Sequence, residues 1–598
     1  MKTALCKSFY YDCVIDIDND LSTFKNANDI VKDKSLKVLG VTFNHRGYNI
    51  HDKNYIKGLI DYLDIDHLMF SLRPSLSNFL NESKKLDIAK FKKYSHLTFL
   101  LQAMARYEIN FGYIEASKIL KTTDILQLCE EVLQYFQDII STISIQGNDI
   151  ELKKDFAAIL SLEEVKSRLV GKKIIYFENT LFDDIEIEKS ILFKAQISEL
   201  EKDIFWLGFD SDFKEVPWEK DYQETKWNRI ISKTNFGEAS FENSIKYCNR
   251  CCMPETMEGI TFDEFGICTP CRSSEEKMHI NWEEREKILN EIISQNKSQN
   301  YYDCLLPMSG GKDSMFQAYI LTYKYGLTPL AVTHGANWMS LTGRYNLENC
   351  LIKFDLDHLI FHAKRSVINR AARKSLTEIG DACWHCHIGA GTFVIQTALS
   401  WKLNLLIWGE SIAERDGRGS YINQSEASLY YNLEVSGKVK AEDFVDEFLD
   451  EKELSKWFYP NKESLQQSKI RYLHLGDYMF WDEEKQVDFV VNEFEWMNSK
   501  VENTFKGYKS NECVMAGVHD YANFIKRGIG RASVQASDDI RRGLITREEG
   551  IELAKKYDSQ RPHALDFYLK ITGYSEHEFE DILIEARKLS KDAGKFNN

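Results

Sequence analysis

The stretch YDCLLPMSGGKDS, residues 302–314, decides the fold prediction for this chain of 598 residues. Its first half is a short apolar run, its second half holds two glycines, a lysine and two serines, and a helix-like segment, 315–325, follows. A strand that enters a glycine-rich turn and then a helix brings backbone N–H groups and the helix dipole to one place. Lys312 adds a full positive charge. The stretch therefore predicts a phosphate-binding loop, against the alternative of a solvated glycine-rich turn.

The spacing inside this SGGKDS loop (residues 309–314) separates it from the common loop of nucleoside triphosphatases. In GxxxxGK[ST] the lysine directly precedes Ser or Thr, whereas here Asp313 stands between Lys312 and Ser314. The hexapeptide resembles instead the pyrophosphate-binding loop of the ATP pyrophosphatases, which cleave ATP between the α and β phosphates and transfer AMP to an oxygen.

Composition narrows the class of protein. With 43 % hydrophobic and 28 % charged residues, the chain can form three or four packed units. A formal charge of −16 argues against broad nucleic-acid binding. No apolar run approaches the roughly 18 residues of a membrane helix, and the first eight residues lack a signal-peptide core, so we expect a cytoplasmic protein without a membrane partner. Thirteen cysteines, several in CxxC pairs, then favour metal or redox chemistry over disulfides.

Residues 303 to about 418, which contain the SGGKDS loop, alternate apolar and amphipathic segments. We expect strands at 304–308, 330–333, 358–361 and 403–408, and helices around 314–325, 343–353, 366–378 and 390–401. This order is typical of an α/β fold with a doubly wound parallel sheet, which binds ligands at the carboxyl ends of its strands. The polar residues predicted at those ends are Ser309, Gly310, Gly311, Lys312, Asp313, Ser314, Thr333, His334, Gly409 and Glu410. Asp313 and Glu410 are candidates for Mg²⁺ or substrate, against solvated loop carboxylates.

The sequence repeats itself at an offset of 291 residues. YYDC at 10–13 recurs at 301–304, and DIDHLMF at 64–70 recurs as DLDHLIF at 355–361. Between 10–70 and 301–361 there are 14 identities in 61 ungapped positions. We favour a degenerate second copy of the nucleotide-binding fold over two unrelated segments with similar strand composition. The loop position in the first copy, 18–23, has no glycine or lysine and two carboxylates, so this copy is predicted to be structural, dimerising or regulatory.

Four units follow from these patterns. Residues 1–240 form the degenerate α/β domain, 241–285 a zinc ribbon, 286–425 the nucleotide-binding domain, and 426–598 a mainly helical substrate or cap region. Charge-rich helical segments are expected there at 443–457, 483–502 and 546–557.

Two CxxC pairs predict a structural zinc site. Cys248 and Cys251 are separated from Cys268 and Cys271 by the spacing of a zinc ribbon. Four thiolates complete a tetrahedron and leave no open position, so the alternative is a set of unmetallated or redox thiols. Cys252 is a spare neighbour.

Two further groups are ambiguous. Cys383, Cys386 and His387 could belong to a second metal or iron–sulfur site with a distant ligand such as Cys350 or Cys513, to the substrate pocket, or to packed thiols. Farther on, five cationic residues in 521–531 and 538–543, Arg531 among them, could receive an anionic substrate group, or they could form a solvated basic face. Residues 416–419, DGRG, are predicted to form a mobile loop near the same edge.

Taken together, residues from about 247 to 557 resemble the N-acetyl sugar amidotransferases of bacterial surface-polysaccharide and nonulosonic-acid pathways. The segments that carry the resemblance, besides the SGGKDS loop, are CNRCCMPET (248–256), GITFD (259–263), CTPCR (268–272), INW (280–282), GDACWHCH (380–387), IWGE (407–410), GDY (476–478), HDY (519–521) and GRA (530–532). The family usually lacks a long N-terminal extension, so the role of residues 1–240 is not inherited from it.

The resemblance implies conversion of a sugar acetamido group into an acetamidino group. Attack of the amide oxygen on the α-phosphorus of ATP expels pyrophosphate, and ammonia then displaces AMP. In this scheme Gly310, Gly311 and Lys312 hold the pyrophosphate, Ser309 and Ser314 donate hydrogen bonds, and Asp313 helps place Mg²⁺. We find no glutaminase nucleophile motif, so a separate glutaminase subunit is the predicted source of ammonia. An N-acetylated sugar or nucleotide sugar is the other partner, and a homodimer is one assembly to test.

The leading alternative is a tRNA sulfur-transferase, because those proteins also combine such a loop with zinc knuckles and a cysteine pair. Cys383 and Cys386 keep this alternative open, while the acidic balance weighs against it. A nucleotide-sensing scaffold would need an inert loop, which the intact Lys312 and glycines disfavour. The sugar, the oligomeric state and the metal content of the Cys383 segment do not follow from the sequence.

Overall fold

The fold is taken from a computed structural model of the chain. The described residues are 11–17, 27–28, 30–31, 36–44, 56–57, 59–61, 63–75, 87–115, 124–144, 162–177, 245–257, 259–297, 302–335, 338–411, 413, 421 and 439–589. The predicted anionic loop at 18–23 and the predicted mobile loop at 416–419 lie outside them.

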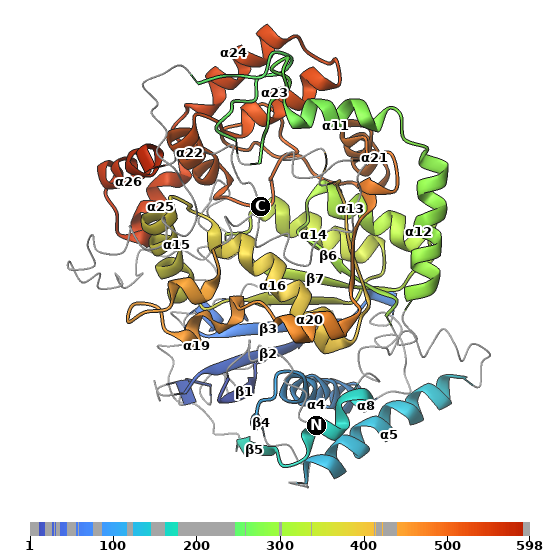
Figure 1. Ribbon diagram of the computed structural model, residues 1–598. Helices are drawn as coiled ribbons and strands as arrows, with labels where there is room; N and C mark the ends of the chain where they lie inside the picture. The colour runs from blue at the N-terminus through green and yellow to red at the C-terminus, as the bar shows by residue number, and fades with distance from the viewer. Residues whose placement is uncertain are drawn as a thin grey trace.

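One ten-stranded sheet runs through the described residues, in the order β10-β9-β6-β7-β8-β3-β2-β1-β4-β5. Figure 1 shows β6 and β7 of one half above β1 to β5 of the other. The strands are β1 (Cys13–Asp16), β2 (Val38–Asn44), β3 (Asp66–Ser71), β4 (Phe111–Glu115), β5 (Lys173–Phe177), β6 (Cys304–Pro307), β7 (Pro329–Gly335), β8 (His358–His362), β9 (Leu405–Trp408) and β10 (Arg471–His474). Every pairing is parallel except that of β3 with β8, which joins the two halves of the sheet. The sheet is therefore two parallel halves placed edge to edge.

Both halves have the same strand order. Counted from the central pair outward, the first half runs β3-β2-β1-β4-β5 and the second runs β8-β7-β6-β9-β10. The repeat seen in the sequence thus corresponds to equivalent strands. β1 and β6 each begin at the cysteine of a YYDC segment, and β3 and β8 contain the equivalent segments HLMF and HLIF.

The helices of the first half are α4 (Ile88–Arg106), α5 (Ile125–Ser144), α8 (Leu162–Val165) and the 3-10 helix η1 (Lys166–Leu169). In the second half they are α12 (Trp282–Asn296), α13 (Lys312–Tyr319), the π-helix η2 (Ile320–Lys324), α14 (Leu341–Lys353), α15 (Arg365–Ile379) and α16 (Trp384–Trp401). The four strands and four helices predicted for this half are confirmed. The last helix starts six residues earlier than expected, because the CWHCH segment forms its first turn.

Alternate residues of the second-half strands face two different cores, as expected of a sheet covered on both faces. Leu305 and Val332 pack with residues of α15 and α16, while Leu306 and Ala331 pack with residues of α13 and α14. The first of these cores continues into the first half through Val14 and α4, so the two halves share one hydrophobic layer.

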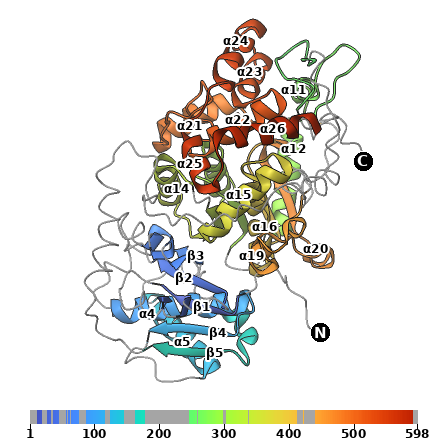
Figure 2. The ribbon, with the colours of Figure 1, turned by 90° about the vertical axis from the view of Figure 1, so that its left-hand side faces the viewer.

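The last third of the chain is helical, with one strand added to the sheet. Its elements are η3 (Ala441–Phe444), α19 (Glu451–Leu454), η4 (Ser455–Trp457), α20 (Lys462–Ser468), η5 (Leu475–Asp477), α21 (Glu483–Phe494), α22 (Ala516–Arg527), α23 (Arg531–Arg541), α24 (Arg547–Asp558), α25 (Ala564–Thr572) and α26 (Glu576–Leu589). The continuous helix predicted at 443–457 is wrong: the chain forms short turns there, because Asp446, Asp450 and Ser455 bond to nearby backbone groups. Figure 2 shows α22 to α26 on the side of the second half away from β1 to β5.

Among the described residues, no helix is both long and apolar enough to cross a membrane.

Candidate functional site

The SGGKDS loop lies between the carboxyl end of β6 and the first turn of α13. Gly310 has a φ of +85°, and a Cβ at this position would overlap the carbonyl oxygen of Gly343. Only glycine suits such a position without strain. Gly311 caps α13, and its N–H donates to Ser309 Oγ at 3.2 Å, while Ser314 Oγ donates to the carbonyl of Gly311 at 2.8 Å. The local fold thus has the strand, turn and helix geometry that the sequence predicts.

Lys312 is buried at the start of α13 and is held by two carboxylates. Its Nζ lies 2.5 Å from Asp313 Oδ2 and 2.6 Å from Glu483 Oε1, with 6 % of the side chain exposed. Burial lowers the pKa of Lys312, but the two carboxylates more than offset this and hold the pKa above its ordinary value. The lysine therefore carries its charge at neutral pH. The helix dipole disfavours a cation at the N-terminal end of a helix, so the charge of Lys312 is stable there only with an anion beside it.

Glu483, at the start of α21, joins the loop to the helical region. It also pairs with Lys509 and lies 3.7 Å from Arg542. These cations overcome the effect of burial and hold the pKa of Glu483 well below its ordinary range. Glu483 is thus an ionised carboxylate placed between Lys312 and the cations of the C-terminal region.

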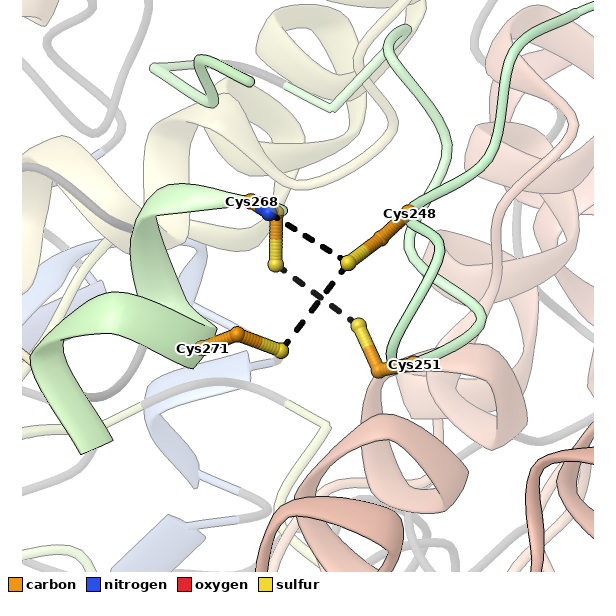
Figure 3. Close-up of side chains that lie close together, drawn as sticks. All are labelled: Cys248, Cys251, Cys268 and Cys271. Carbon is orange, nitrogen blue, oxygen red and sulfur yellow. Dashed lines mark hydrogen bonds between the residues drawn. The ribbon is translucent and has the colours of Figure 1, made fainter. Parts of the chain in front are cut away.

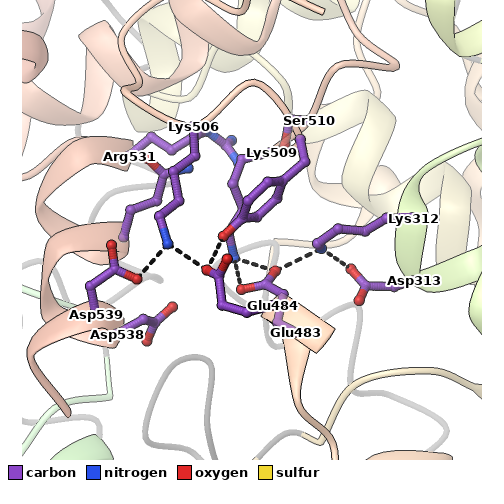
Figure 4. Close-up of polar contacts among 12 residues, drawn as sticks. Lys312, Asp313, Glu483, Glu484, Lys506, Lys509, Ser510, Arg531, Asp538 and Asp539 are labelled. Carbon is purple, nitrogen blue, oxygen red and sulfur yellow. Dashed lines mark hydrogen bonds and ion pairs between the residues drawn. The ribbon is translucent and has the colours of Figure 1, made fainter. Parts of the chain in front are cut away.

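The ion-pair network continues behind Glu483 (Figure 4). Glu484 binds Lys506 and the hydroxyl of Tyr508, and Lys506 Nζ reaches Asp539 Oδ1 at 2.6 Å. Burial and the neighbouring carboxylates raise the pKa of Tyr508, so its hydroxyl remains a donor. The network brings together residues from α13, α21, α23 and the segment between α21 and α22.

Carboxylates also gather on the loop side of Lys312. Burial raises the pKa of Asp313, and the charges of Glu410 and Glu483 add to this against the attraction of Lys312. Glu512 faces the loop as well, since a Cβ on Gly311 would lie 3.6 Å from its Oε2. Burial likewise raises the pKa of Glu512. Among the described residues, the four-cysteine cluster is the one set whose ligand atoms all lie within 4.8 Å of one another, so these carboxylates do not form a close ligand group. Carboxylate oxygens are nevertheless the ligand type that Mg²⁺ prefers.

The other predicted strand-end residues have mixed roles. Thr333 uses its hydroxyl inside the fold, donating to Met308 O at 2.7 Å and lying 2.8 Å from His358 Nε2. His334 is enclosed, because a Cβ on Gly389 would overlap its ring and Trp457 Nε1 lies 3.4 Å from its Nε2. Gly409 lies against Trp481, and the carbonyl of Glu410 bonds to His474 Nδ1 at 2.7 Å.

The two CxxC pairs converge on one point (Figure 3). The sulfur atoms of Cys248 and Cys271 are 4.0 Å apart, those of Cys251 and Cys268 are 3.6 Å apart, and all four lie within 4.8 Å of one another. Four thiolates at the usual Zn–S length of about 2.3 Å would be about 3.8 Å apart. The buried cluster therefore fits a tetrahedral ion such as Zn²⁺.

The cysteine cluster is joined to the helices that line the ion-pair network. Cys252 packs outside the cluster, with its sulfur 3.4 Å from Ser533 O and 3.1 Å from Ser537 Oγ of α23. Arg547 of α24 donates to the carbonyls of Cys248 and Cys251 at 3.2 and 3.1 Å. The cluster thus holds α23 and α24 in place. Asp539 lies in α23, and Arg542 directly follows that helix.

The Cys383 segment forms no comparable group among the described residues. Burial raises the pKa of Cys386 to about 11 and that of Cys513 to about 12, so both thiols are protonated. His387 packs its ring against His519, centroid to centroid 5.1 Å, and His519 Nδ1 lies 3.9 Å from Asp381 Oδ1. The ligand atoms of this segment do not all lie within 4.8 Å of one another among the described residues, and the second metal site stays a prediction.

Arg531 is bound within the helical region. Its Nε donates to Asp520 Oδ2 at 2.5 Å and its Nη1 to Ser510 Oγ at 2.6 Å. It appears beside Lys506 and Lys509 in Figure 4.

The sequence does not mark five residues of the network as site residues: Glu483, Lys506, Tyr508, Lys509 and Glu512. They lie about 170 to 200 positions after the loop in charge-rich segments, and many such residues are solvated. Only the packing of α21 on α13 shows which of them reach Lys312.

The comparisons with known proteins concern the region that supplies Lys506, Tyr508, Lys509 and Glu512, and not Glu483. Residues 491–593 match the model of the C-terminal domain of WbpG-like lipopolysaccharide biosynthesis proteins. No curated protein matches the chain. The matched region includes Lys506, Lys509 and α22 to α26, so this part of the chain is similar to the C-terminal domain of WbpG-like lipopolysaccharide biosynthesis proteins.

Proposed function

We propose that the protein is an ATP-dependent amidotransferase that converts the acetamido group of an N-acetylated sugar into an acetamidino group in surface-glycan biosynthesis. The observation that carries the proposal is the loop itself. A buried, charged Lys312 stands at the N-terminus of α13, directly after the left-handed turn at Gly310. This arrangement suits an anion such as the β,γ-pyrophosphate of ATP.

The chain's own groups have the following tasks. Backbone N–H groups of 310–312 and the Lys312 ammonium bind the pyrophosphate and neutralise charge on the leaving group. Ser309 adds a hydroxyl donor, Ser314 holds the turn by donating to the Gly311 carbonyl, and Asp313 with Glu410 supports Mg²⁺. Most of the acceleration comes from positioning and charge stabilisation, because the chain needs to supply no covalent intermediate.

The reaction has two displacements. In the first, the acetamido oxygen bonds to the α-phosphorus of ATP and the bond to the β-phosphate oxygen breaks, releasing pyrophosphate. In the second, ammonia bonds to the amide carbon, AMP leaves with the former acetamido oxygen, and one proton is lost. The amide oxygen is otherwise a poor leaving group, which is why adenylylation must come first.

Ammonia needs a source, because little of it is unprotonated at neutral pH. We propose a separate glutaminase subunit as that source. The cysteine cluster is proposed to hold a structural Zn²⁺ that keeps α23 and α24 in place.

The similarity of 491–593 to lipopolysaccharide biosynthesis proteins supports a sugar substrate, because this region supplies Lys506 and Lys509 opposite the loop. The sequence resemblance to N-acetyl sugar amidotransferases supports the type of transfer.

One assay tests the proposal. The protein is incubated with ATP, Mg²⁺, ammonium and a panel of N-acetylated sugars and nucleotide sugars, and AMP and pyrophosphate are measured. Sugar-dependent release of both is expected. Release of ADP and phosphate, or turnover that needs no acetamido group, would refute the mechanism.

The variant Lys312→Met is the matching control. It keeps the aliphatic stem but removes the charge, and turnover should fall by at least about 100-fold, the usual scale for one lost electrostatic contact to a developing charge. Its zinc content should equal that of the unaltered protein; a loss of both would instead indicate misfolding.

A further inference from the structure

The contact between the two halves has the register of a two-fold axis. In the antiparallel pair of β3 and β8, Met69 lies opposite Ile360, and these two residues are themselves related by the offset of 291. His67 lies opposite His362, and Ser71 lies opposite His358. The offset converts one pair into the other, because His67 corresponds to His358 and Ser71 corresponds to His362. Such a self-complementary arrangement is what an isologous dimer interface shows between two subunits.

Hydrogen bonds across this contact come in matched pairs. Ser75 donates to Asp355 from its N–H at 2.8 Å and from its hydroxyl at 2.6 Å, and Ser366 donates to Asp64 in the same way at 3.0 and 2.6 Å. Each serine lies 291 residues from the other, as do the two aspartates.

Within each half, a buried aspartate repeats the same environment. Asp66 accepts from the hydroxyl of Tyr11 and Asp357 from that of Tyr302, both at 2.8 Å. Each also accepts from a backbone N–H of the opposite half, Asp66 from Lys364 and Asp357 from Arg73, both at 2.7 Å. The repeated Tyr and Asp residues of the sequence are therefore parts of one duplicated interface.

The symmetry fails at one charge. Asp357 is neutralised by the guanidinium of Arg73, whose Nη2 is 3.0 Å from its Oδ2. The equivalent of Arg73 is Lys364, but its side chain extends to Asp64 at 3.4 Å. The cation that meets Asp66 is Lys456 of η4, at 2.6 Å, with side-chain exposures of 1 % and 3 %. The first half thus uses this position to hold an element of the C-terminal region.

A second residue of the first half, Lys37, also binds the segment that carries Lys456. Lys37 Nζ lies 3.0 Å from Ser455 Oγ and also binds the carbonyl of Lys452. Burial, followed by the charge of Lys456, lowers the pKa of Lys37 to about 7. Figure 1 shows α19, which directly precedes η4, beside β2 and β3.

The held element touches the predicted nucleotide site. Trp457 follows Lys456, and its Nε1 lies 3.4 Å from Nε2 of His334 near the end of β7. Its ring also packs against Trp384 and His385 of α16, at 6.0 and 6.2 Å. Burial and then the charge of Lys456 lower the pKa of His334 to about 4, so the imidazole is neutral.

We propose that the first half takes the place of a second subunit and holds Trp457 against His334 through the Asp66–Lys456 ion pair. Asp66 and Lys456 are positioning residues in this proposal, and the effect on nucleotide binding rests on the proposed function.

The duplicated interface supplies its own control. Asp66→Asn and Asp357→Asn remove the same carboxylate charge from equivalent buried sites, so both should lower the melting temperature to a similar extent. Only Asp66→Asn should weaken binding of α,β-methylene ATP with Mg²⁺, by at least fivefold, while Asp357→Asn should stay within twofold of the unaltered protein. Lys456→Met should behave like Asp66→Asn, and Lys456→Arg should restore binding, because Arg73 fills the mirror position.

A second readout separates this inference from the proposed function. The imidazole resonances of His334 in ¹⁵N-histidine spectra should shift in Asp66→Asn but not in Asp357→Asn, whether or not the nucleotide binds. Nucleotide binding that is absent in the unaltered protein, together with the expected His334 shift, would refute the proposed function alone. Equal effects of the two aspartate variants on His334 would overturn the inference.

Discussion

Replacing Glu483 by glutamine should make the protein less stable and yet bind pyrophosphate more tightly. In the proposed function, Glu483 is the carboxylate that competes with a phosphate group for Lys312, because its Oε1 lies 2.6 Å from the lysine Nζ. Glutamine keeps the size and part of the hydrogen bonding but removes the competing charge.

The magnitude follows from the geometry. Two charges 2.6 Å apart attract by about 6 kcal/mol at an effective dielectric constant of 20, and desolvation offsets much of this. Lys312 also keeps Asp313 as a partner. We therefore expect a loss of about 2–3 kcal/mol in unfolding free energy, which for a chain of 598 residues corresponds to about 2 °C in melting temperature. Freeing Lys312 of one competitor should strengthen binding of Mg²⁺-pyrophosphate by up to about tenfold, the equivalent of 1.4 kcal/mol.

The loss of stability should depend on pH with a defined sign. The pKa of Glu483 in the folded protein is well below its ordinary value, so its stabilising effect is present above the unfolded pKa of about 4.3. That effect is lost as the pH falls through the folded pKa. The difference in melting temperature between the unaltered protein and Glu483→Gln should therefore be largest at pH 7 and should shrink below about pH 4.

Calorimetric titration with pyrophosphate and Mg²⁺, beside thermal melts, measures both effects. Glu484→Gln is the matched control: it lies in the same helical turn but contacts Lys506 and Tyr508 instead of Lys312. It should leave pyrophosphate binding within twofold. Weaker binding by Glu483→Gln would refute the argument that this carboxylate competes with the ligand for Lys312.

Two further predictions concern the loop and the cysteine cluster. Gly310→Ala should reduce pyrophosphate binding more than tenfold, because its φ of +85° and the nearby Gly343 carbonyl exclude a Cβ, whereas Gly311→Ala, whose added Cβ would meet Ser309 Oγ at 3.2 Å, should cost less. Cys271→Ser should lower the zinc content measured by atomic absorption and the melting temperature together, while Cys252→Ser, outside the cluster, should retain the metal; equal zinc in both variants would refute the four-sulfur site.

Much of the second half follows from local signals. The apolar run 304–307, the glycines at 310 and 311 and the apolar period of the following helices correctly predict β6, α13 and the strands that flank them. The CxxC spacing likewise predicts the four sulfurs that converge near 4 Å. These features depend on residues close together in the chain, whose geometry is set by short-range sterics and hydrogen bonds.

The partners of Lys312 could not be predicted in this way. Glu483 and Lys509 lie far along the chain in segments with many charges, and a charged side chain is usually solvated unless packing buries it. Similarly, the segment 443–457, predicted to be helical, forms short turns instead, and these bring Lys456 into an ion pair with Asp66.

Local sequence patterns predict the strand β6, the glycine-rich turn and helix α13 that follow it, the four cysteines that converge, and the repeat at offset 291. Long-range packing makes the repeated halves meet through β3 and β8 in antiparallel register, and it places Glu483 at the start of α21 against Lys312. The physical reason is the range of the interactions. Turn and strand preferences are local, whereas the choice among many chemically similar edges and charges is made only when burial removes water and each buried group must find a partner.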